Sequence, residues 1–521
     1  MTETVVPFEP RFGAFVIESL TLGMYGESRN AIREYVQNGF DSLRQAMADG
    51  LVTPDAARID VEMGTDHLTI RDNGSGLRSE NAASVLAAIG ASNKDYRNNA
   101  GFRGIGRLAG VVFCNELIFT TKAKGQNQFT KVVFNAAMLR AKLSPENTYE
   151  KGAAETLAEC VTATRDDAED SEAHYFEVKL KGLYNPPDEC LDVDAMRTYL
   201  SQVAPLPYNP DFSFAEQIKL KARDAGFAIE SVRLFVKNGG AEPVELFKPY
   251  SDTLAVKRTR APMTGIDFQE SPTRRWWGWV SRKRASGAVQ DPWRGIRVRI
   301  RNIQIDDTKV MREIFAESNL VETPRSSYSR FADWYVGEIF VDPKAAIPNA
   351  RRDGFEENRG WEDMRNELDA QIATPLGKMA YKTSKADQLS LENLNKVATG
   401  LSQAVALLEV EDGPTAAIVE PLMEEAASLR TRIAAAIRIA EAGEIEPLEA
   451  LAVRRSELQR RLEVLYAKVP AHTCEEEIGE ALEQMVAQLL KEFKSRLAPQ
   501  EWLKVKAIVT EVSGIESSVG T

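Results

Sequence analysis

Three short polar motifs follow one another between residues 29 and 107, and their order constrains the fold more than any other feature of the chain. The first lies in a helical run over Arg29–Met47. The second ends a hairpin-like pair of strands over Ile59–Met63 and His67–Ile70, and the third is a glycine-rich segment before an apolar run. A helix, a hairpin and a glycine-rich turn in this order predict a mixed α/β unit.

The first motif places Glu34, Asn38 and Asp41 on the helical run at spacings i, i+4 and i+7. At about 100° per residue, these side chains lie within roughly 60° of one another and share one face. A carboxylate and an amide aligned in this way can hold Mg²⁺ through oxygen ligands while a second carboxylate polarises a water molecule. The plain alternative is an exposed polar stripe.

The second motif, Arg71–Gly76, puts the carboxylate of Asp72 at the end of a strand and follows it with Gly74 and Gly76. Glycines let the backbone approach a ligand closely and leave room for a planar base. The acid can accept a hydrogen bond from an exocyclic amine of that base. Taken alone, the same pattern is also that of a common tight turn.

The third motif, Gly101–Arg107, carries three glycines immediately before a run that can be helical. Free amide groups and the helix dipole at such a position both attract an anion, so the segment can cradle phosphate. Arg103 and Arg107 can add charge-assisted hydrogen bonds to phosphate, or can be ordinary surface arginines.

Together, in this order and spacing, the motifs resemble the N-box, G1 and G2 motifs of the GHKL ATPases, which include gyrase, heat-shock chaperone, histidine-kinase and mismatch-repair ATPases. The resemblance covers about residues 12–180, and Arg33–Asp41 looks like the N-box of the ninety-kilodalton heat-shock chaperones. It implies that Glu34 is the general base and Asn38 the Mg²⁺ ligand.

The resemblance further implies that Asp72 binds the adenine amine, that two glycines line the base pocket and that the third motif forms a lid over the phosphates. Ile89–Lys94 resembles the lid entry of microrchidia-type ATPases. The implied ATP-binding residues are Arg33, Asn38, Asp41, Asp72, Gly74, Gly76, Lys94, Gly101, Arg103, Gly104, Ile105 and Gly106. One departure is His174–Val178, where the family often has a Gly-Thr pair near the base.

The resemblance continues in Gly295–Asn302 and Ile347–Asp353, which look like the middle domain of the same chaperones. In that domain an arginine after a strand reaches the γ-phosphate. Arg352 fits this position best and is expected to be catalytic, Arg351 is the second choice, and Lys344 resembles the reaching lysine of mismatch-repair relatives.

These patterns divide the chain into three expected domains. Residues 1–185 are expected to form a Bergerat-type α/β sandwich that binds ATP, with the acidic stretch Glu150–Glu172 as a solvated surface loop. Residues 186–385 are expected to form a second α/β, transducer-like middle domain. Residues 386–521 carry apolar residues at helical spacing and are expected to be all helical, with Pro447 and Pro470 as breaks.

Composition argues against several classes of protein, namely membrane, secreted, zinc-binding and disulfide-rich proteins. No stretch approaches the roughly 18 consecutive apolar residues of a membrane helix, and Met1–Pro10 lacks the pattern of a signal peptide. A cytoplasmic location without membrane contact is therefore expected. The four cysteines and three histidines are scattered, which argues against structural zinc and a disulfide framework.

The net charge of −12 argues against nucleic-acid binding by the whole surface, but not by a local patch. Between Lys257 and Arg301, cations alternate with Trp276, Trp277, Trp279 and Trp293, a pattern that can form a stacking and phosphate-binding surface. In Ile296–Ile300, however, arginines alternate with apolar residues as in a half-buried strand with one solvated face.

The leading hypothesis is a Mg²⁺-dependent, chaperone-like conformational ATPase that hydrolyses ATP, forms a homodimer and acts on protein clients or partner proteins. Its main rival is an ATP-driven clamp on nucleic acid, like microrchidia or mismatch-repair proteins, with genome defence as one role. A scaffold that binds nucleotide without hydrolysis is the third class, against which Glu34 and Arg352 argue. The three histidines give no phosphoacceptor on a neighbouring helix, which disfavours a histidine kinase.

Overall fold

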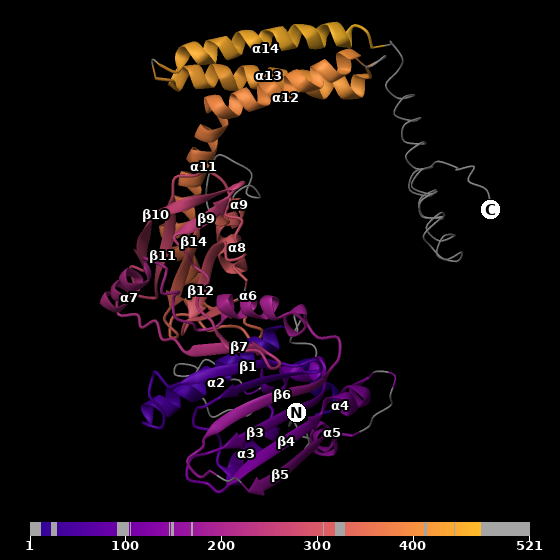
Figure 1. The fold of residues 1–521 in the computed structure, drawn as a ribbon, viewed down its shortest axis with the longest axis vertical. Helices are drawn as coiled ribbons and strands as arrows, with labels where there is room; N and C mark the ends of the chain where they lie inside the picture. Colours follow the sequence, from indigo (N-terminus) through magenta and orange to yellow (C-terminus); the bar gives the residue numbers. More distant parts are fainter. Residues whose placement is uncertain are drawn as a thin grey trace, which may run out of the picture. The chain divides into compact units, whose positions relative to one another are not determined.

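The computed structural model describes residues 12–21, 29–90, 104, 106–144, 146, 151–167, 170–305, 307–317, 329–410, 414–441 and 443–469. The chain forms two compact units, residues 1–382 and 383–521. The first unit holds two sheets, and the described part of the second is helical (Figure 1). The coarse expectation of a mixed α/β protein with a large sheet is confirmed.

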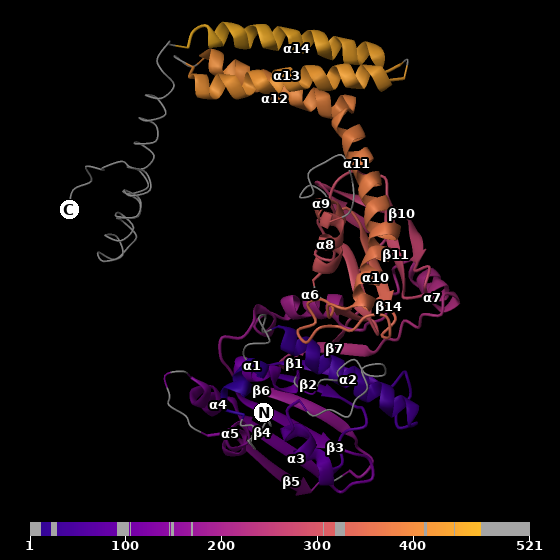
Figure 2. The same ribbon diagram turned by 180° about the vertical axis from the view of Figure 1, so that it is seen from behind.

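The larger sheet has eight strands in the order β5-β4-β3-β6-β2-β1-β7-β8. They are β1 (Arg58–Met63), β2 (His67–Asp72), β3 (Cys114–Lys122), β4 (Gln128–Asn135), β5 (Val161–Asp167), β6 (Tyr175–Leu183), β7 (Arg233–Asn238) and β8 (Val244–Glu245). The helices around it are α1 (Phe15–Thr21), α2 (Asn30–Ala48), α3 (Ser79–Ala87), α4 (Ala136–Leu143), α5 (Ala153–Cys160) and α6 (Val193–Val203), with short 3-10 helices η1 (Gly106–Val112) and η2 (Asp188–Cys190). Figure 2 shows them from behind.

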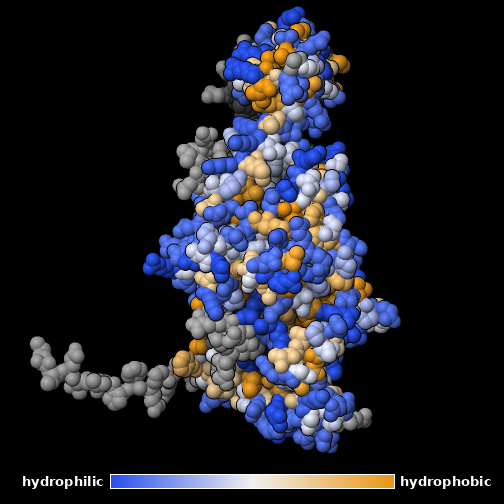
Figure 3. Space-filling view, turned by 90° about the vertical axis from the view of Figure 1, so that its left-hand side faces the viewer, coloured by the Kyte–Doolittle hydropathy of each residue, from blue (hydrophilic) through white to orange (hydrophobic). Residues whose placement is uncertain are grey.

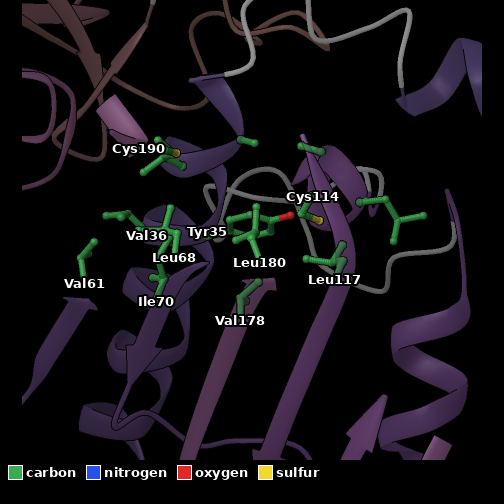
Figure 4. Close-up of a cluster of buried hydrophobic side chains, with 14 of the residues drawn as sticks. Tyr35, Val36, Val61, Leu68, Ile70, Cys114, Leu117, Val178, Leu180 and Cys190 are labelled. Carbon is green, nitrogen blue, oxygen red and sulfur yellow. The ribbon is translucent and has the colours of Figure 1, made fainter. Parts of the chain in front are cut away.

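One core holds this sheet and its helices together. Buried and partly buried residues alternate along β1 and β2, as expected for strands with one covered face. The covered face meets the apolar side of α2, where Tyr35 and Val36 lie against Leu68, Ile70 and Leu180 (Figure 4). Each large side chain buried in this way contributes about 1.5–3 kcal/mol. This packing fixes α2 across the sheet and thereby places its polar residues.

Two segments depart from the expected organisation. The stretch Glu150–Glu172, expected to be a surface loop, contains α5 and the edge strand β5. The β-branched residues Val161, Thr162 and Thr164 favour extended backbone there, and the acidic composition hid this preference. The strand β7, which follows residue 185 by some distance, pairs in parallel with β1 and so belongs to the larger sheet.

The second sheet of this unit has six strands in the order β13-β12-β14-β11-β10-β9. They are β9 (Thr253–Val256), β10 (Thr259–Glu270), β11 (Trp276–Lys283), β12 (Gly295–Ile300), β13 (Ile303–Ile305) and β14 (Val336–Val341). The helices are α7 (Ala215–Asp224), α8 (Lys309–Glu317), α9 (Ser329–Ala332), α10 (Arg359–Leu368) and α11 (Thr374–Gln388), with a π-helical turn, η4, at Asp369–Ala373.

The tryptophans of the second sheet are core residues. Trp276 packs in the cluster on one side of the sheet, and Trp277 and Trp279 pack in the cluster on the other. Each of these three residues is at most 2% exposed, and Trp293 is partly buried against the same core. The expected stacking surface for bases is therefore not formed, because large indole rings gain more from burial than from solvent exposure.

The strand β12 is also buried throughout, which corrects the expected solvated arginine face. Arg299 forms an ion pair with Glu338 of β14, and Lys248 approaches the same carboxylate at 2.9 Å with both side chains fully buried. Arg297 donates to the side-chain oxygen of Gln202 at 2.8 Å and to backbone carbonyls. Such partners are what allow charged side chains inside a core.

The second unit contains three long helices, α12 (Leu391–Val410), α13 (Ala416–Ile439) and α14 (Ile445–Tyr466). One apolar cluster joins them through buried residues such as Val405, Leu429 and Leu458. Pro447 lies in the first turn of α14, where proline is tolerated, instead of breaking the helix. None of the described helices is long and apolar enough to cross a membrane, and Figure 3 shows a largely hydrophilic face with scattered apolar residues.

Candidate active site

Glu34 lies on α2 and forms an ion pair with Arg352, a residue 318 positions later in the chain. The Nε of Arg352 is 3.2 Å from a carboxylate oxygen of Glu34, and their side chains are only 7% and 10% exposed. The Coulomb attraction within an ion pair screened from water in this way is greater than within a surface pair. The two residues that the sequence singled out as catalytic therefore lie together in the folded chain.

The loop between β14 and α10 forms hydrogen bonds within itself, and these hold Arg352 in place. Asn349 accepts a hydrogen bond from the backbone N–H of Arg352 at 3.2 Å and donates its side-chain amide to Asp353 at 2.7 Å. The backbone of Arg352 is left-handed, with φ of 56°. Left-handed backbone is uncommon for residues other than glycine, so the loop is built to hold this arginine at a cost in local strain.

The other two candidates for the phosphate-reaching cation are placed differently. Arg351 is exposed, and its backbone carbonyl accepts a hydrogen bond from Arg33 at 3.2 Å. Lys344 is exposed, and its backbone N–H bonds to Asp342 at 2.8 Å. Of the three, Arg352 is the one that the described structure pairs with Glu34.

The loop after β2 packs closely against α2. Asp72 is buried, and its Oδ1 accepts the backbone N–H of Gly74 at 2.9 Å. A Cβ added to Gly74 would overlap Ser42, whose backbone carbon lies 2.8 Å from that position. A Cβ on Gly39 would be 3.4 Å from Oδ2 of Asp72. These small residues let the carboxylate sit against the helix, so the motif is more than an ordinary surface turn.

Sequence reasoning missed two side chains that fix this loop. The Nδ1 of His174 donates to the carbonyl of Gly74 at 2.7 Å. Thr121, on β3, accepts the backbone N–H of Leu77 at 2.8 Å and donates to the carbonyl of Tyr175 at 3.1 Å. His174 stands where the family often has a Gly-Thr pair, so the departure noted in the sequence was the available signal.

The third motif is described only in part. Lys94, Gly101, Arg103 and Ile105 lie outside the described residues. Gly104 has left-handed backbone with φ of 73°, and Gly106 begins η1.

The hydroxyl of Tyr35 ties α2 to η1. It donates to the carbonyl of Arg107 at 3.0 Å and accepts the backbone N–H of Gly110 at 2.8 Å. The Arg107 guanidinium donates to the carbonyl of Val85, and burial lowers its pKa. Arg107 is thus engaged by α3 in this arrangement.

Asn38 and Asp41 complete the polar side of α2. Asp41 is buried, and Asn38 is half-buried, with no side-chain hydrogen bond to another described residue. No group of three or more His, Cys, Asp or Glu side chains among the described residues can hold a metal ion. A single amide oxygen fits Mg²⁺ in the way that phosphate-bound Mg²⁺ is held, by one or two protein ligands together with phosphate oxygens and water.

Comparison with known families finds a match to the first part of the chain. Residues 26–159 match the family model of the histidine kinase-, DNA gyrase B-, and HSP90-like ATPases. The match includes α2, the loop after β2 and the glycine-rich segment before η1. It supports the coarse resemblance to GHKL ATPases and does not separate chaperone-like from microrchidia-like proteins. No curated protein matches the chain.

Proposed function

We propose that this chain binds ATP on α2 and hydrolyses it to ADP and phosphate. The observation that carries the proposal is the buried pair of Glu34 and Arg352. It joins α2, in the segment that matches the ATPase family model, to a cation of residues 186–385, here called the second region. A buried carboxylate beside a guanidinium is suited to the transfer of a phosphoryl group to water. That reaction needs a base for the attacking water and a cation near the phosphate.

Each residue has a defined part in this proposal. Asp72 accepts the exocyclic amine of adenine, and Gly39, Gly74 and Ser42 shape the space around that end of the nucleotide. Eight residues separate Ser42 from Glu34, a span of about 12 Å along the helix, which suits a nucleoside triphosphate lying along α2. Mg²⁺, when bound, would neutralise charge on the phosphates, and Asn38 would be its protein ligand.

The contact between Glu34 and Arg352 also suggests how hydrolysis is timed. In this structure the guanidinium of Arg352 engages the carboxylate of Glu34. A γ-phosphate carries more negative charge than one carboxylate, so it competes for Arg352 and draws it away from Glu34. Glu34 is then available to accept a proton from the attacking water, while Arg352 stabilises the charge on the transferring phosphoryl group.

Hydrolysis in this arrangement would act on the second region, because several contacts join it to α2. Arg29 pairs with Asp307 at 2.9 Å, and Arg44 pairs with Glu230 at 2.8 Å. We therefore assign the chain to the chaperone-like conformational ATPases, as a homodimer whose movements act on partner proteins. The exposed apolar side chains of the second unit, such as Leu407 and Val410, support a protein partner.

Asp72→Asn tests the proposal directly. The asparagine keeps an oxygen for the N–H of Gly74 but replaces the other carboxylate oxygen with an N–H donor that opposes the adenine amine. We expect ATP affinity, measured by calorimetry, to fall about tenfold or more, since a lost charge-assisted bond costs about 1.5–3 kcal/mol. Asp66→Asn, in the exposed β1–β2 turn, is the matched control. An affinity for Asp72→Asn within a factor of about three of wild type would refute the assignment.

A further inference from the structure

Two neighbouring segments of the second region gather five cations, Lys257, Arg258, Arg282, Lys283 and Arg284, here called the basic tip. The first segment is the turn that joins β9 to β10, and the second is the end of β11 with the residue that follows it. They lie side by side, because Val256 bridges Val289 and Lys257 donates to Ser286 at 3.4 Å. Residues that are separate in the sequence therefore form one positive site.

Among the described residues, two acidic groups lie near the basic tip, and each pairs with an arginine. Asp267 pairs with Arg282 at 3.3 Å. Asp291 accepts the backbone N–H of Ala255 at 2.7 Å and pairs with Arg260. Arg258 and Arg284 are exposed and form no ion pair within the described part of the chain. In a chain of net charge −12, this local excess of positive charge is a distinct feature.

Lys283 lies within the basic tip and is affected by the same excess of positive charge. Its ammonium group donates to the carbonyls of Ala285 at 2.8 Å and Gly287 at 2.7 Å and lies 5.2 Å from the ring centre of Trp334. Burial, followed by the nearby charge of Lys257, lowers the pKa of Lys283 to about 8. Lowering by a neighbouring cation shows that the charges of Lys257 and Lys283 lie close enough to repel each other.

The β9–β10 turn has a lysine in a strained backbone conformation. Val256 pairs with Thr259, so the hairpin has a two-residue turn made of Lys257 and Arg258. Lys257 is left-handed, with φ of 55°, while Arg258 is not. A two-residue turn with left-handed backbone at its first position normally has glycine there. Strain kept at an exposed position suggests that the side chain has a use.

We propose that the basic tip binds the phosphate backbone of a nucleic acid, an interaction that goes beyond the proposed ATPase function. Guanidinium groups match phosphate geometry well. None of the described residues within 245–378 exposes a large apolar side chain, so the tip lacks the apolar anchor that a protein interface or membrane insertion uses. Trp276, Trp277 and Trp279 are buried and cannot stack on bases, so the contact is made to phosphates and accepts duplex DNA.

Binding of a short duplex DNA to the full chain, followed by fluorescence anisotropy over a series of salt concentrations, tests the proposal. We expect the logarithm of the association constant to fall linearly with the logarithm of salt concentration. Removing Arg258 and Arg284 together as glutamines should reduce the magnitude of that slope by about 1.8, at about 0.9 per phosphate contact. Arg223→Gln, which removes an exposed arginine from α7, should leave the slope unchanged.

Lys257→Gly separates binding from a structural role. Glycine accepts the left-handed backbone, so the unfolding temperature should not fall, while the salt slope should weaken by about 0.9. Three results would each overturn the proposal: no DNA binding by the wild type at low salt, the same slope in wild type and tip variants, or binding only to vesicles that contain anionic lipid. ATP affinity of the same variants, measured in parallel, keeps this outcome independent of the proposed ATPase function.

Discussion

The carboxylate of Glu34 is engaged by a guanidinium in this structure, although a general base must face a water molecule. The two demands are compatible only when something removes Arg352 from Glu34. A γ-phosphate is the natural competitor, because guanidinium forms bidentate, charge-assisted bonds with phosphate. The strained backbone of Arg352 is consistent with a side chain whose position matters more than its local conformational energy.

Arg352→Ala should therefore reduce ATP hydrolysis by about 10³-fold while leaving ATP affinity nearly unchanged. Binding of ATP exchanges the contact of Arg352 with Glu34 for one with the γ-phosphate, so the net contribution of this arginine to affinity is small, while it stabilises the charge that develops on the phosphoryl group during transfer. Turnover and calorimetric affinity, measured on the same preparation, check both halves of the expectation. Arg351→Ala and Lys344→Ala are the matched variants. Normal turnover in Arg352→Ala with a loss in either neighbour would move the role to that residue.

Glu34→Ala should keep ATP binding and lose hydrolysis by about 10²–10⁴-fold, since the attacking water loses its base. Loss of the carboxylate also releases Arg352, so binding should be equal to or tighter than in the wild type. Single-turnover measurements with bound ATP distinguish slow chemistry from slow product release. Unchanged turnover would exclude Glu34 as the base.

Sequence reasoning selected these residues as candidates because their motifs are local. The spacing of Glu34, Asn38 and Asp41 needs only a helix, and α2 supplies it. The contacts of His174 and Thr121 depend instead on which strands become neighbours, since both reach the Asp72 loop from other strands or their ends. No spacing rule within one segment contains that information. The choice of Arg352 came from family resemblance, and its contact with Glu34 became visible only in the folded chain.

At the scale of elements, the loop after β2 is built around close backbone approach. Gly76 has φ of 62°, and a Cβ there would lie 2.7 Å from the backbone carbon of Lys122 and 2.9 Å from the carbonyl oxygen of Tyr175. Gly125 has φ of 78° but open space around it. The two positions share a backbone requirement and differ only in their surroundings.

Gly76→Ala and Gly125→Ala therefore form a matched pair. Both should lose about 1–2 kcal/mol of folding free energy from left-handed backbone. Gly76→Ala should also displace the loop that carries Asp72 and abolish ATP binding, while Gly125→Ala should bind ATP normally. Denaturant unfolding and calorimetry provide the two readings. Equal ATP affinity in both variants would show that the loop does not shape the nucleotide site.

The buried cluster around Glu338 joins β12 and β14 and makes a pH-dependent contribution to stability. Burial alone would raise the pKa of Glu338, but Arg299 and Lys248 outweigh it and lower the pKa to about 2. The folded pKa lies below the unfolded value of 4.5, so the stabilising contribution is present above pH 4.5 and is lost as pH falls from 4.5 toward 2.

Replacing Glu338 with glutamine and both Lys248 and Arg299 with methionine in one variant tests this contribution. Removing all three charges avoids the large cost of leaving a buried charge unpaired. The free energy of unfolding of the wild type should fall more steeply below pH 4.5 than that of the triple variant. Parallel curves would mean that other carboxylates control the acid sensitivity.

Elements with a clear period were predictable and those with mixed signals were not. The α2 stripe and the β1–β2 hairpin follow simple periods of 3.6 and 2 and were placed within about two residues. The alternation of β12 was read correctly as a strand, but its arginine face turned out to be buried. Burial of that face depends on Glu338 and Gln202 from elsewhere in the chain, which periodicity does not reveal.

At the scale of the whole molecule, contacts over long sequence separations join the parts of the first unit. Ile303 of β13 belongs to the core of the larger sheet, and β7 extends that sheet beside β1. Arg29 and Arg44, near the two ends of α2, both pair with acids of the second region. A single sequence carries no direct signal for such pairings, so the extent of contact between the two predicted regions could not be foreseen.

The second unit carries exposed apolar side chains that favour self-association of the chain. On α12, Leu407 and Val410 are 69% and 87% exposed and lie three residues apart on one side of the helix. Side chains of this kind favour association when they meet an apolar surface. The ATP motifs all lie in the first unit, so association through the second unit should not require nucleotide.

A chain that ends at Gln388 keeps α11, which packs on the first unit through a hydrogen bond from Tyr335 to the carbonyl of Leu376 at 2.8 Å. We expect this truncated chain to lose self-association, measured by light scattering over a concentration series, and to keep ATP affinity. In the full chain, Leu407→Glu with Val410→Glu should weaken association, while Asn395→Glu, an added charge at an exposed position more than three turns earlier in α12, should not. If the truncated chain keeps the oligomeric state of the full chain, the first unit contains the contact, and the helices serve a different partner.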